Sequence, residues 1–204
     1  MFLRRWLDIS VFSLVLLSSC WQPTCAQEPV RKYFNVSTVF SYLGEDIRDG
    51  RVYHAYLLTS QQSFNLTPRR ARLPLIARME LHAGITNFMT GGNRDWELAS
   101  VAGLETHYTF RNQVRITASL TSGPAFISAV TFKQRRGFIF SNNPVVSVMI
   151  PLGQGGWYIR PEYRFRHQSN IGFWRPNGGI DNFFFGIGLG HALRTNDLTD
   201  NQDH

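Results

Sequence analysis

The chain has 204 residues, enough for one folded domain or one small barrel, and it is basic, with a formal net charge of +7. A basic balance fits nucleic acid, an anionic membrane surface or an acidic substrate. The sequence has no recognition-helix or zinc-finger signature, so nucleic acid is excluded as the expected partner. No stretch after residue 27 holds about 18 consecutive apolar residues, which excludes membrane-spanning helices.

The first 26 residues have the pattern of a cleaved export signal. Arg4 and Arg5 give it a positive start, and residues 9–17 form an apolar stretch too short to span a membrane as a helix. We favour cleavage after Ala26. The run at residues 17–20, Leu-Ser-Ser-Cys, resembles a lipobox and leaves lipoprotein processing open as the alternative.

Both cysteines, Cys20 and Cys25, lie in this signal segment. Cleavage after residue 26 therefore leaves a mature chain without cysteine, which removes disulfides and cysteine-ligated metals from consideration. We expect a single domain over residues 27–193, a polar tail over 194–204, and neither a metal nor a cofactor. A cysteine-free exported chain fits a periplasmic or outer-membrane destination.

Apolar and polar residues alternate with a period of two along most of the chain, interrupted by Gly, Pro and Asn. This pattern is typical of strands with two different faces. Eight strands are expected, at residues 33–43, 52–60, 75–86, 97–110, 113–121, 144–151, 157–169 and 182–193. An even number of antiparallel strands predicts an all-β fold, an eight-stranded transmembrane barrel of the bacterial outer membrane.

The lengths of the connections support this topology. Periplasmic turns of such barrels are short and extracellular loops are longer. The expected turns are 111–112 and 152–156, and the expected loops are 122–143 and 170–181. The connection 61–74 is too long for a periplasmic turn, unless the second strand continues through Phe64 and Leu66.

The strand at 157–169 predicts which face points inward. Its charged face carries Arg160, Glu162, Arg164 and Arg166, and its other face is apolar until His167. The third and fourth strands also gather charged and polar side chains on one face, namely Arg78, Glu80, His82, Glu105 and His107. We therefore expect a lumen filled by paired charges, with the apolar faces toward lipid.

By the same parity, His167 and Ser169 fall on the lipid face, where polar groups without partners are costly. Antiparallel pairing of the last two strands brings Asp181 beside them at one rim. A serine nucleophile, a histidine base and a carboxylate that orients the base are the groups of a serine esterase. The amides of Asn170 and Asn177, or free N–H groups of the glycine-rich loop 171–180, are candidate oxyanion donors.

The run His167-Gln168-Ser169-Asn170, followed by residues 176–181 (Pro-Asn-Gly-Gly-Ile-Asp), resembles the signature of the outer-membrane lipid A 3-O-deacylase family. This resemblance implies an eight-stranded barrel with an outward-facing triad that needs no metal. It implies Ser169 as nucleophile, His167 as base, and Gly172 and Asn177 near the oxyanion. Asn170 matches the Asn that follows the family's serine.

Asp181 stands where the family has a glutamate, so its side chain is one methylene shorter. The implied substrate is lipid A of lipopolysaccharide in the outer leaflet, and the implied partner is outer-membrane lipid. A homodimer is left open. Two other readings compete: a non-catalytic structural or adhesive barrel, and a soluble lipocalin-like barrel with a fatty ligand inside.

Overall fold

A computed structural model of the chain describes residues 32–43, 45–48, 51–67, 73–86, 95–130 and 133–193. The predicted export signal at 1–26 and the polar tail at 194–204 lie outside these residues. In the part that is described, no helix is long and apolar enough to cross a membrane.

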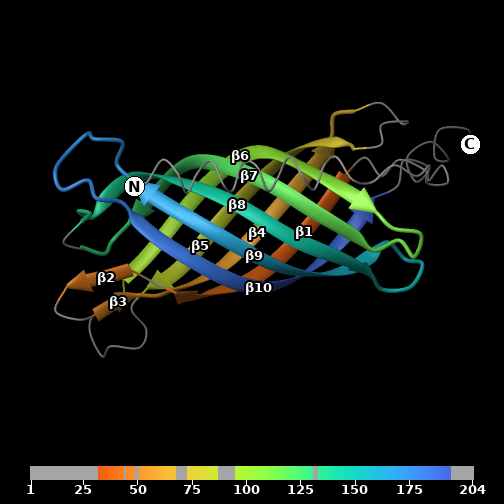
Figure 1. The fold of residues 1–204 in the computed structure, drawn as a ribbon, viewed down its shortest axis with the longest axis horizontal. Coiled ribbons are helices and arrows are strands. Elements are labelled where there is room, and N and C mark those ends of the chain that lie inside the picture. The colour runs from red at the N-terminus through yellow and green to blue at the C-terminus, as the bar shows by residue number, and fades with distance from the viewer. Residues whose placement is uncertain are drawn as a thin grey trace, which may run out of the picture.

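The described chain forms ten strands and no helices. They are β1 (Lys32–Leu43), β2 (Glu45–Arg48), β3 (Arg51–Tyr53), β4 (Ala55–Asn65), β5 (Leu75–Thr86), β6 (Asp95–Thr109), β7 (Arg115–Ile127), β8 (Gly137–Pro151), β9 (Trp157–Ser169) and β10 (Ile180–Leu193). Eight of them close into an antiparallel barrel, in which β1 pairs with both β10 and β4 (Figure 1). The predicted eight-stranded antiparallel barrel is thus confirmed.

The second predicted strand, 52–60, was wrong in its bounds. Val52 belongs to β3, which pairs only with β2 in a separate two-stranded sheet, whereas the barrel strand β4 begins at residue 55. β4 continues through Phe64, as the alternative reading required, and Leu66 lies just beyond its end. The connection that was too long, 61–74, therefore shrinks to 66–74.

The fifth and sixth predicted strands were too short. β7 runs on to residue 127 and β8 starts at residue 137, so the loop between them is 128–136 rather than 122–143. Gln113 lies outside β7 with a φ of 68°. The remaining strands match their predicted bounds within about two residues, which is the usual uncertainty of strand ends.

Proline explains why these two strands were cut short. Pro124 in β7 and Pro144 in β8 lie inside strands, as does Pro161 in β9. Each coincides with a gap in the register of one neighbouring ladder, while pairing continues on both sides of the gap. Because proline lacks an N–H donor, it interrupts a ladder locally, and in this barrel the interruption does not end the strand.

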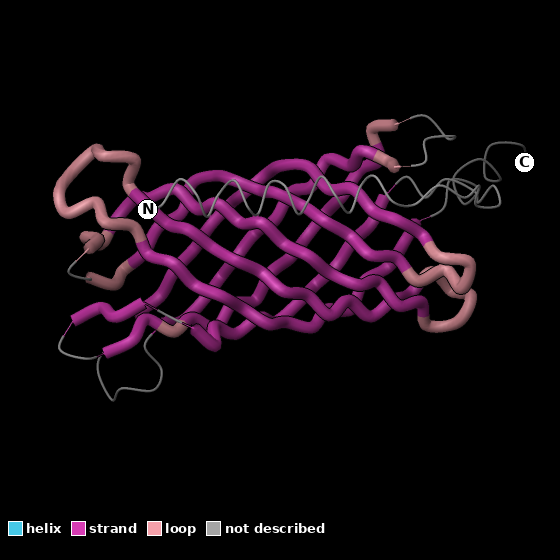
Figure 2. The backbone as a smooth tube through the Cα atoms, in the orientation of Figure 1, coloured by secondary structure: helices cyan, strands magenta, loops and turns pink. Residues whose placement is uncertain are grey.

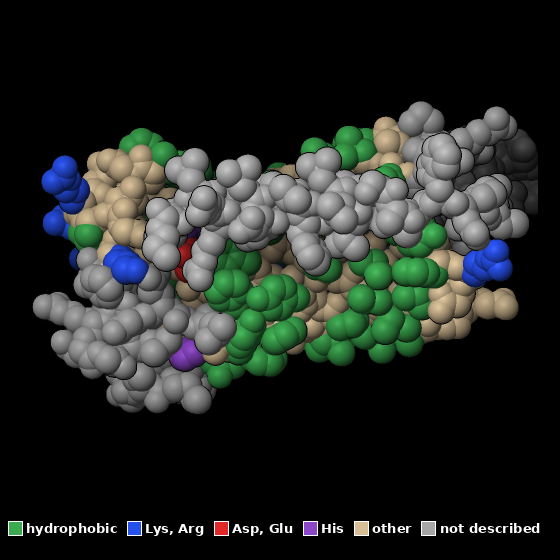
Figure 3. Space-filling model, in the orientation of Figure 1, with side chains coloured by type: hydrophobic (Ala, Val, Ile, Leu, Met, Phe, Trp, Pro, Cys, Tyr) green, Lys and Arg blue, Asp and Glu red, His purple; other side chains and the backbone are tan. Residues whose placement is uncertain are grey.

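The outer wall of the barrel is apolar, the reverse of a soluble barrel. Leu81, Leu120 and Ile187 are 62%, 60% and 58% exposed. Figure 3 shows apolar side chains gathered along the wall between the two ends, with lysine and arginine at the ends. The predicted parity of inward and outward faces is confirmed.

The central lumen is filled by ion pairs. Its buried charges are four arginines and four glutamates, which balance: Arg78, Arg160, Arg164, Arg166, Glu80, Glu97, Glu105 and Glu162. Arg164 reaches Glu80 at 2.7 Å and Glu162 at 3.0 Å. The predicted charge-paired plug is confirmed, and it contradicts a lipocalin-like interior, because a fatty ligand needs an apolar lumen.

The two ends of the barrel differ. The turns at 110–114 and 152–156 lie at one end, together with the start of β1 and the end of β10, because Lys32 pairs with Leu193. The β2–β3 sheet, the β7–β8 loop (128–136) and the β9–β10 loop (170–179) lie at the other (Figure 2). This second end carries the candidate site.

Candidate active site

The pair His167–Asp181 is the centre of the site. The two residues are direct cross-strand partners in the β9–β10 ladder. His167 Nδ1 lies 2.6 Å from Asp181 Oδ1, and the two side chains are 33% and 40% exposed. A carboxylate at this distance accepts a hydrogen bond from the Nδ1–H of the imidazole, which leaves Nε2 free to accept a proton.

Ser169 lies two residues beyond His167 on β9, on the same outward face, and it is half-buried. Its cross-strand neighbour on β8 is Phe140. Within the described chain, the Ser169 hydroxyl makes no hydrogen bond to His167. The structure therefore joins His167 to Asp181 directly and places Ser169 beside them on the same wall.

Gly179 packs against the imidazole of His167. The sequence alone did not predict this contact. It has a φ of +72°, in the left-handed region that favours glycine. A Cβ built on this residue would lie 2.6 Å from Cε1 and 3.3 Å from Nε2 of His167. Glycine at 179 is therefore what lets the end of the β9–β10 loop close over the ring.

Asn170 holds the β9–β10 loop together and is fully buried. Its amide donates to the carbonyls of Trp174 at 2.8 Å and Pro176 at 3.3 Å. Its Oδ1 accepts the N–H of Gly172 at 2.9 Å. The amide of Asn170 and the N–H of Gly172, both expected near the oxyanion, are thus already engaged inside the loop.

Asn177 differs from Asn170. Its Oδ1 accepts the backbone N–H of Asn170 at 3.1 Å, which fixes the orientation of the amide. Its Nδ2 donates no hydrogen bond to any described residue and lies near Gly172, 4.0 Å from a Cβ built there. Of the predicted oxyanion groups, the Asn177 amide is the donor that the structure leaves available.

A row of polar side chains extends from the pair across the outer wall, and sequence reasoning missed it. Asn142 on β8 is the cross-strand partner of His167, and Ser122 on β7 is the partner of Asn142. Ser122 Oγ donates to Asn142 Oδ1 at 2.6 Å. The sequence did not predict this row because Ser122 and Asn142 lie in the segment 122–143 that was expected to be a loop, whereas the structure places them in β7 and β8.

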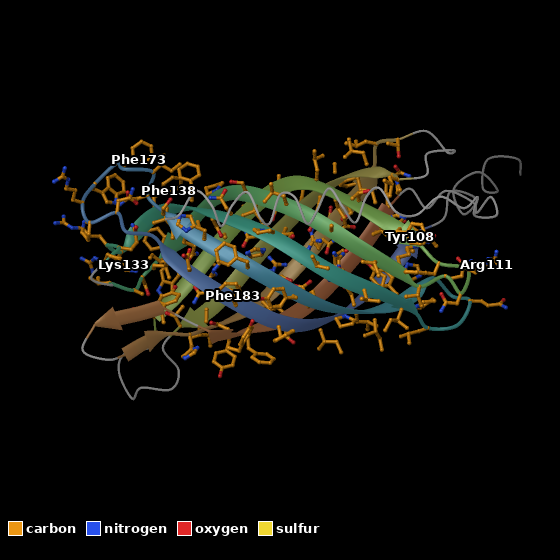
Figure 4. The ribbon with its side chains drawn as sticks, in the orientation of Figure 1. Tyr108, Arg111, Lys133, Phe138, Phe173 and Phe183 are labelled. Atoms are coloured by element: carbon orange, nitrogen blue, oxygen red, sulfur yellow. The ribbon has the colours of Figure 1, made fainter. Side chains whose placement is uncertain are left out.

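An aromatic surface lies below this row on β9 and β10, on the side away from the loops. Phe165 and Phe183 are in contact, with ring centroids 4.9 Å apart. Tyr163 and Phe185 continue the surface, with centroids 5.2 Å apart. Figure 4 shows Phe183 on the barrel wall and Phe173 at the loop end.

Among the described residues, no group of three His, Cys, Asp or Glu side chains is arranged to hold a metal ion.

The sequence matches no protein-family model and no curated protein. Among solved structures, the barrel is similar to the crystal structure of the outer membrane enzyme PagL, with a TM-score of 0.56. The match covers 76% of this chain and 97% of that one, at 14% sequence identity. At this identity the similarity shows the fold, an eight-stranded barrel like that of an outer-membrane enzyme.

Proposed function

We propose that this protein is a serine esterase that removes an ester-linked acyl chain from lipid A at the outer leaflet of the outer membrane of a Gram-negative bacterium. The observation that carries the proposal is the 2.6 Å contact between His167 Nδ1 and Asp181 Oδ1 on the outer wall, with Ser169 on the same face of β9. A polar pair of this kind on an apolar wall costs stability, so function is the better explanation for it.

The apolar wall supports insertion in a membrane. β9 has 13 residues, which corresponds to a length of about 43 Å, or about 33 Å along the axis at a tilt near 40°. This is enough to carry an apolar band of about 25 Å with some strand left at each end. A closed barrel also leaves no strand edge unpaired in lipid.

The two ends of the barrel support the orientation. The chain enters and leaves the barrel at the end with the short turns, which is the periplasmic end in bacterial barrels. The site therefore faces the cell surface, where lipopolysaccharide is found. The aromatic surface below the site then faces the acyl chains of the outer leaflet.

The mechanism follows from the roles of the three side chains. Ser169 Oγ attacks the ester carbonyl carbon while His167 Nε2 takes the hydroxyl proton, and Asp181 stabilises the imidazolium that forms. The tetrahedral intermediate collapses, the sugar alkoxide leaves with the proton from His167, and an acyl-serine remains. Water, deprotonated by His167, then releases the fatty acid and restores Ser169. The first step requires Ser169 Oγ and His167 Nε2 to come within about 3 Å of each other when substrate binds.

Asn177 supplies the electrostatic part of the mechanism. Its Nδ2 is oriented by the bond between its Oδ1 and the N–H of Asn170. A fixed donor aimed at the developing oxyanion needs no reorganisation during the reaction. Asn170 and Gly172 act as positioning residues that give the loop its shape.

The choice of lipid A rests on two similarities. The motif around Ser169 resembles that of lipid A 3-O-deacylases, and the barrel resembles that of the outer membrane enzyme PagL. The basic charge of the chain suits an anionic, phosphorylated lipid.

The test is the mass of lipid A from cells that express the parent protein, Ser169→Ala or the control Ser100→Ala. Ser100 is another exposed serine, on β6 away from the site. The parent and the control are expected to lower the mass by one acyl chain, and Ser169→Ala is expected to leave it unchanged. Equal activity of Ser169→Ala would reject the mechanism. Unchanged lipid A with the parent would favour a non-catalytic barrel.

A further inference from the structure

The β7–β8 loop is joined to the β9–β10 loop beside the candidate site. Gln134 forms an antiparallel bridge with Asn177, and the N–H of Gly178 donates to the carbonyl of Lys133 at 2.9 Å. The side chain of Lys133 also packs over Gly178, because a Cβ built there would lie 2.9 Å from Lys133 Cβ. The first loop is therefore held next to the proposed oxyanion donor.

These two loops carry positive charge and no negative charge. Residues 128–136 and 170–179 contain Lys133, Arg135, Arg136 and Arg175, and neither segment has an Asp or Glu. The three arginines are exposed. Their guanidinium groups form no hydrogen bond or ion pair with any residue that the structure describes. Figure 4 shows Lys133 at this end of the barrel, in the region of Phe173.

The bridge places two of the arginines at the same end of the joined loop segments. Arg136 lies two residues after Gln134, and Arg175 lies two residues before Asn177. Since the bridge is antiparallel, both arginines lie at the same end of it. Positive charges at the same end repel each other, and an anion bound between them is attracted to both. Arginine forks match the oxygens of a phosphate especially well.

We propose that Arg136 and Arg175, flanked by Arg135 and Lys133, bind a phosphate on the headgroup of a phosphorylated glycolipid and so select the substrate whose ester lies at Ser169. This inference rests on the proposed function and adds the part of the substrate that is recognised.

The same loop favours a lipid-borne phosphate over free phosphate. Ile171 and Phe173 are 61% and 62% exposed, and Trp174 is 42% exposed, directly before Arg175. Apolar and aromatic side chains of this kind next to arginine are typical of a membrane interface. The arginines therefore lie at the depth of lipid headgroups.

The test is a binding measurement on the full-length protein in detergent micelles, with Ser169→Ala as the background so that no substrate is consumed. The probes are lipid A with its phosphates and lipid A from which they have been removed. The triple variant Arg135→Gln, Arg136→Gln, Arg175→Gln is compared with Arg111→Gln. Arg111 is an exposed arginine at the opposite end of the barrel (Figure 4).

We expect the triple variant to bind phosphorylated lipid A on the order of tenfold more weakly, since each exposed ion pair is weak but the three add up. Binding of dephosphorylated lipid A should not change, and Arg111→Gln should match the background. Equal affinity of the background protein for the two lipids would overturn the proposal, as would an unchanged affinity in the triple variant. Inorganic phosphate is added as a competitor for the binding of phosphorylated lipid A, with chloride at matched ionic strength as the control. If phosphate competes better than chloride, and as strongly as unlabelled lipid does, the lipid-headgroup assignment is overturned.

The two proposals fail in different ways. Phosphate-dependent binding without any acyl loss from lipid A in cells would reject the esterase and keep the phosphate site. Deacylation of both lipids with the same KM, in the parent and in the triple variant, would reject the phosphate site and keep the esterase.

Discussion

Replacing Gly179 with alanine is expected to displace the imidazole of His167 and leave the barrel intact. The new Cβ would lie 2.6 Å from Cε1 and 3.3 Å from Nε2. Carbon atoms in contact prefer about 3.5–4.0 Å, so the ring or the loop must move by about 1 Å. A displacement of this size in a catalytic group costs about 10²-fold in rate. Alanine at a φ of +72° adds about 1–2 kcal/mol of backbone strain.

Gly153 provides a matched control for the strain. Its φ is +70°, it lies in the β8–β9 turn at the opposite end, and a Cβ built there has nothing within 4 Å. Gly153→Ala and Gly179→Ala share the backbone strain, so Gly179→Ala should lose at least as much free energy of unfolding as Gly153→Ala, while only Gly179→Ala loses activity. The assay is kcat for release of fatty acid from lipid A by purified protein, beside thermal unfolding in detergent. Full activity in Gly179→Ala, or an equal loss in Gly153→Ala, would refute the reasoning.

The other predictions concern single groups. Asp181→Asn is expected to lower kcat about 10³- to 10⁴-fold, because the imidazolium of His167 loses its carboxylate. Asp181→Ala should lower kcat by the same factor, because both variants remove the negative charge. Asn177→Asp keeps the acceptor oxygen that holds the loop but removes the amide donor, and should lower kcat about 10²- to 10³-fold with little change in KM. Glu80→Gln removes one carboxylate partner from each of two buried arginines, Arg78 and Arg164, and should cost about 3–5 kcal/mol in the free energy of unfolding, measured in detergent. Glu162→Gln removes a single 3.0 Å ion pair and should cost less.

The alternation of faces made most of the fold predictable. A barrel wall between lipid and a charged lumen imposes a strict period of two, so the direction of each side chain follows from its position in the strand. The failures came where local chemistry was read as a strand end, as at Pro124 and Pro144. Because ladders on both sides hold a barrel strand, it tolerates the loss of one donor, and no local signal distinguishes this case from a true break.

The site was predictable in its parity but not in its contacts. Alternation placed His167, Ser169 and Asp181 on one face, and the register of β9 and β10 pairs the first with the last directly. It gave no means of telling Asn170 from Asn177, since both are ordinary loop residues. Their difference depends on how the loop folds back on itself: Asn170 is buried and fully bonded, while Asn177 keeps a donor available.

The shorter acid at 181 is explained by the cross-strand register. Side chains directly opposite each other in an antiparallel pair have Cβ atoms about 4.5–5.5 Å apart. From Asp181 this separation suffices for a 2.6 Å contact with His167 Nδ1, so the aspartate needs no further length. A glutamate in the same register would have to fold back or approach the ring from another angle. An aspartate is therefore consistent with the triad proposed for this barrel, because the strand pairing itself brings the carboxylate close to the imidazole.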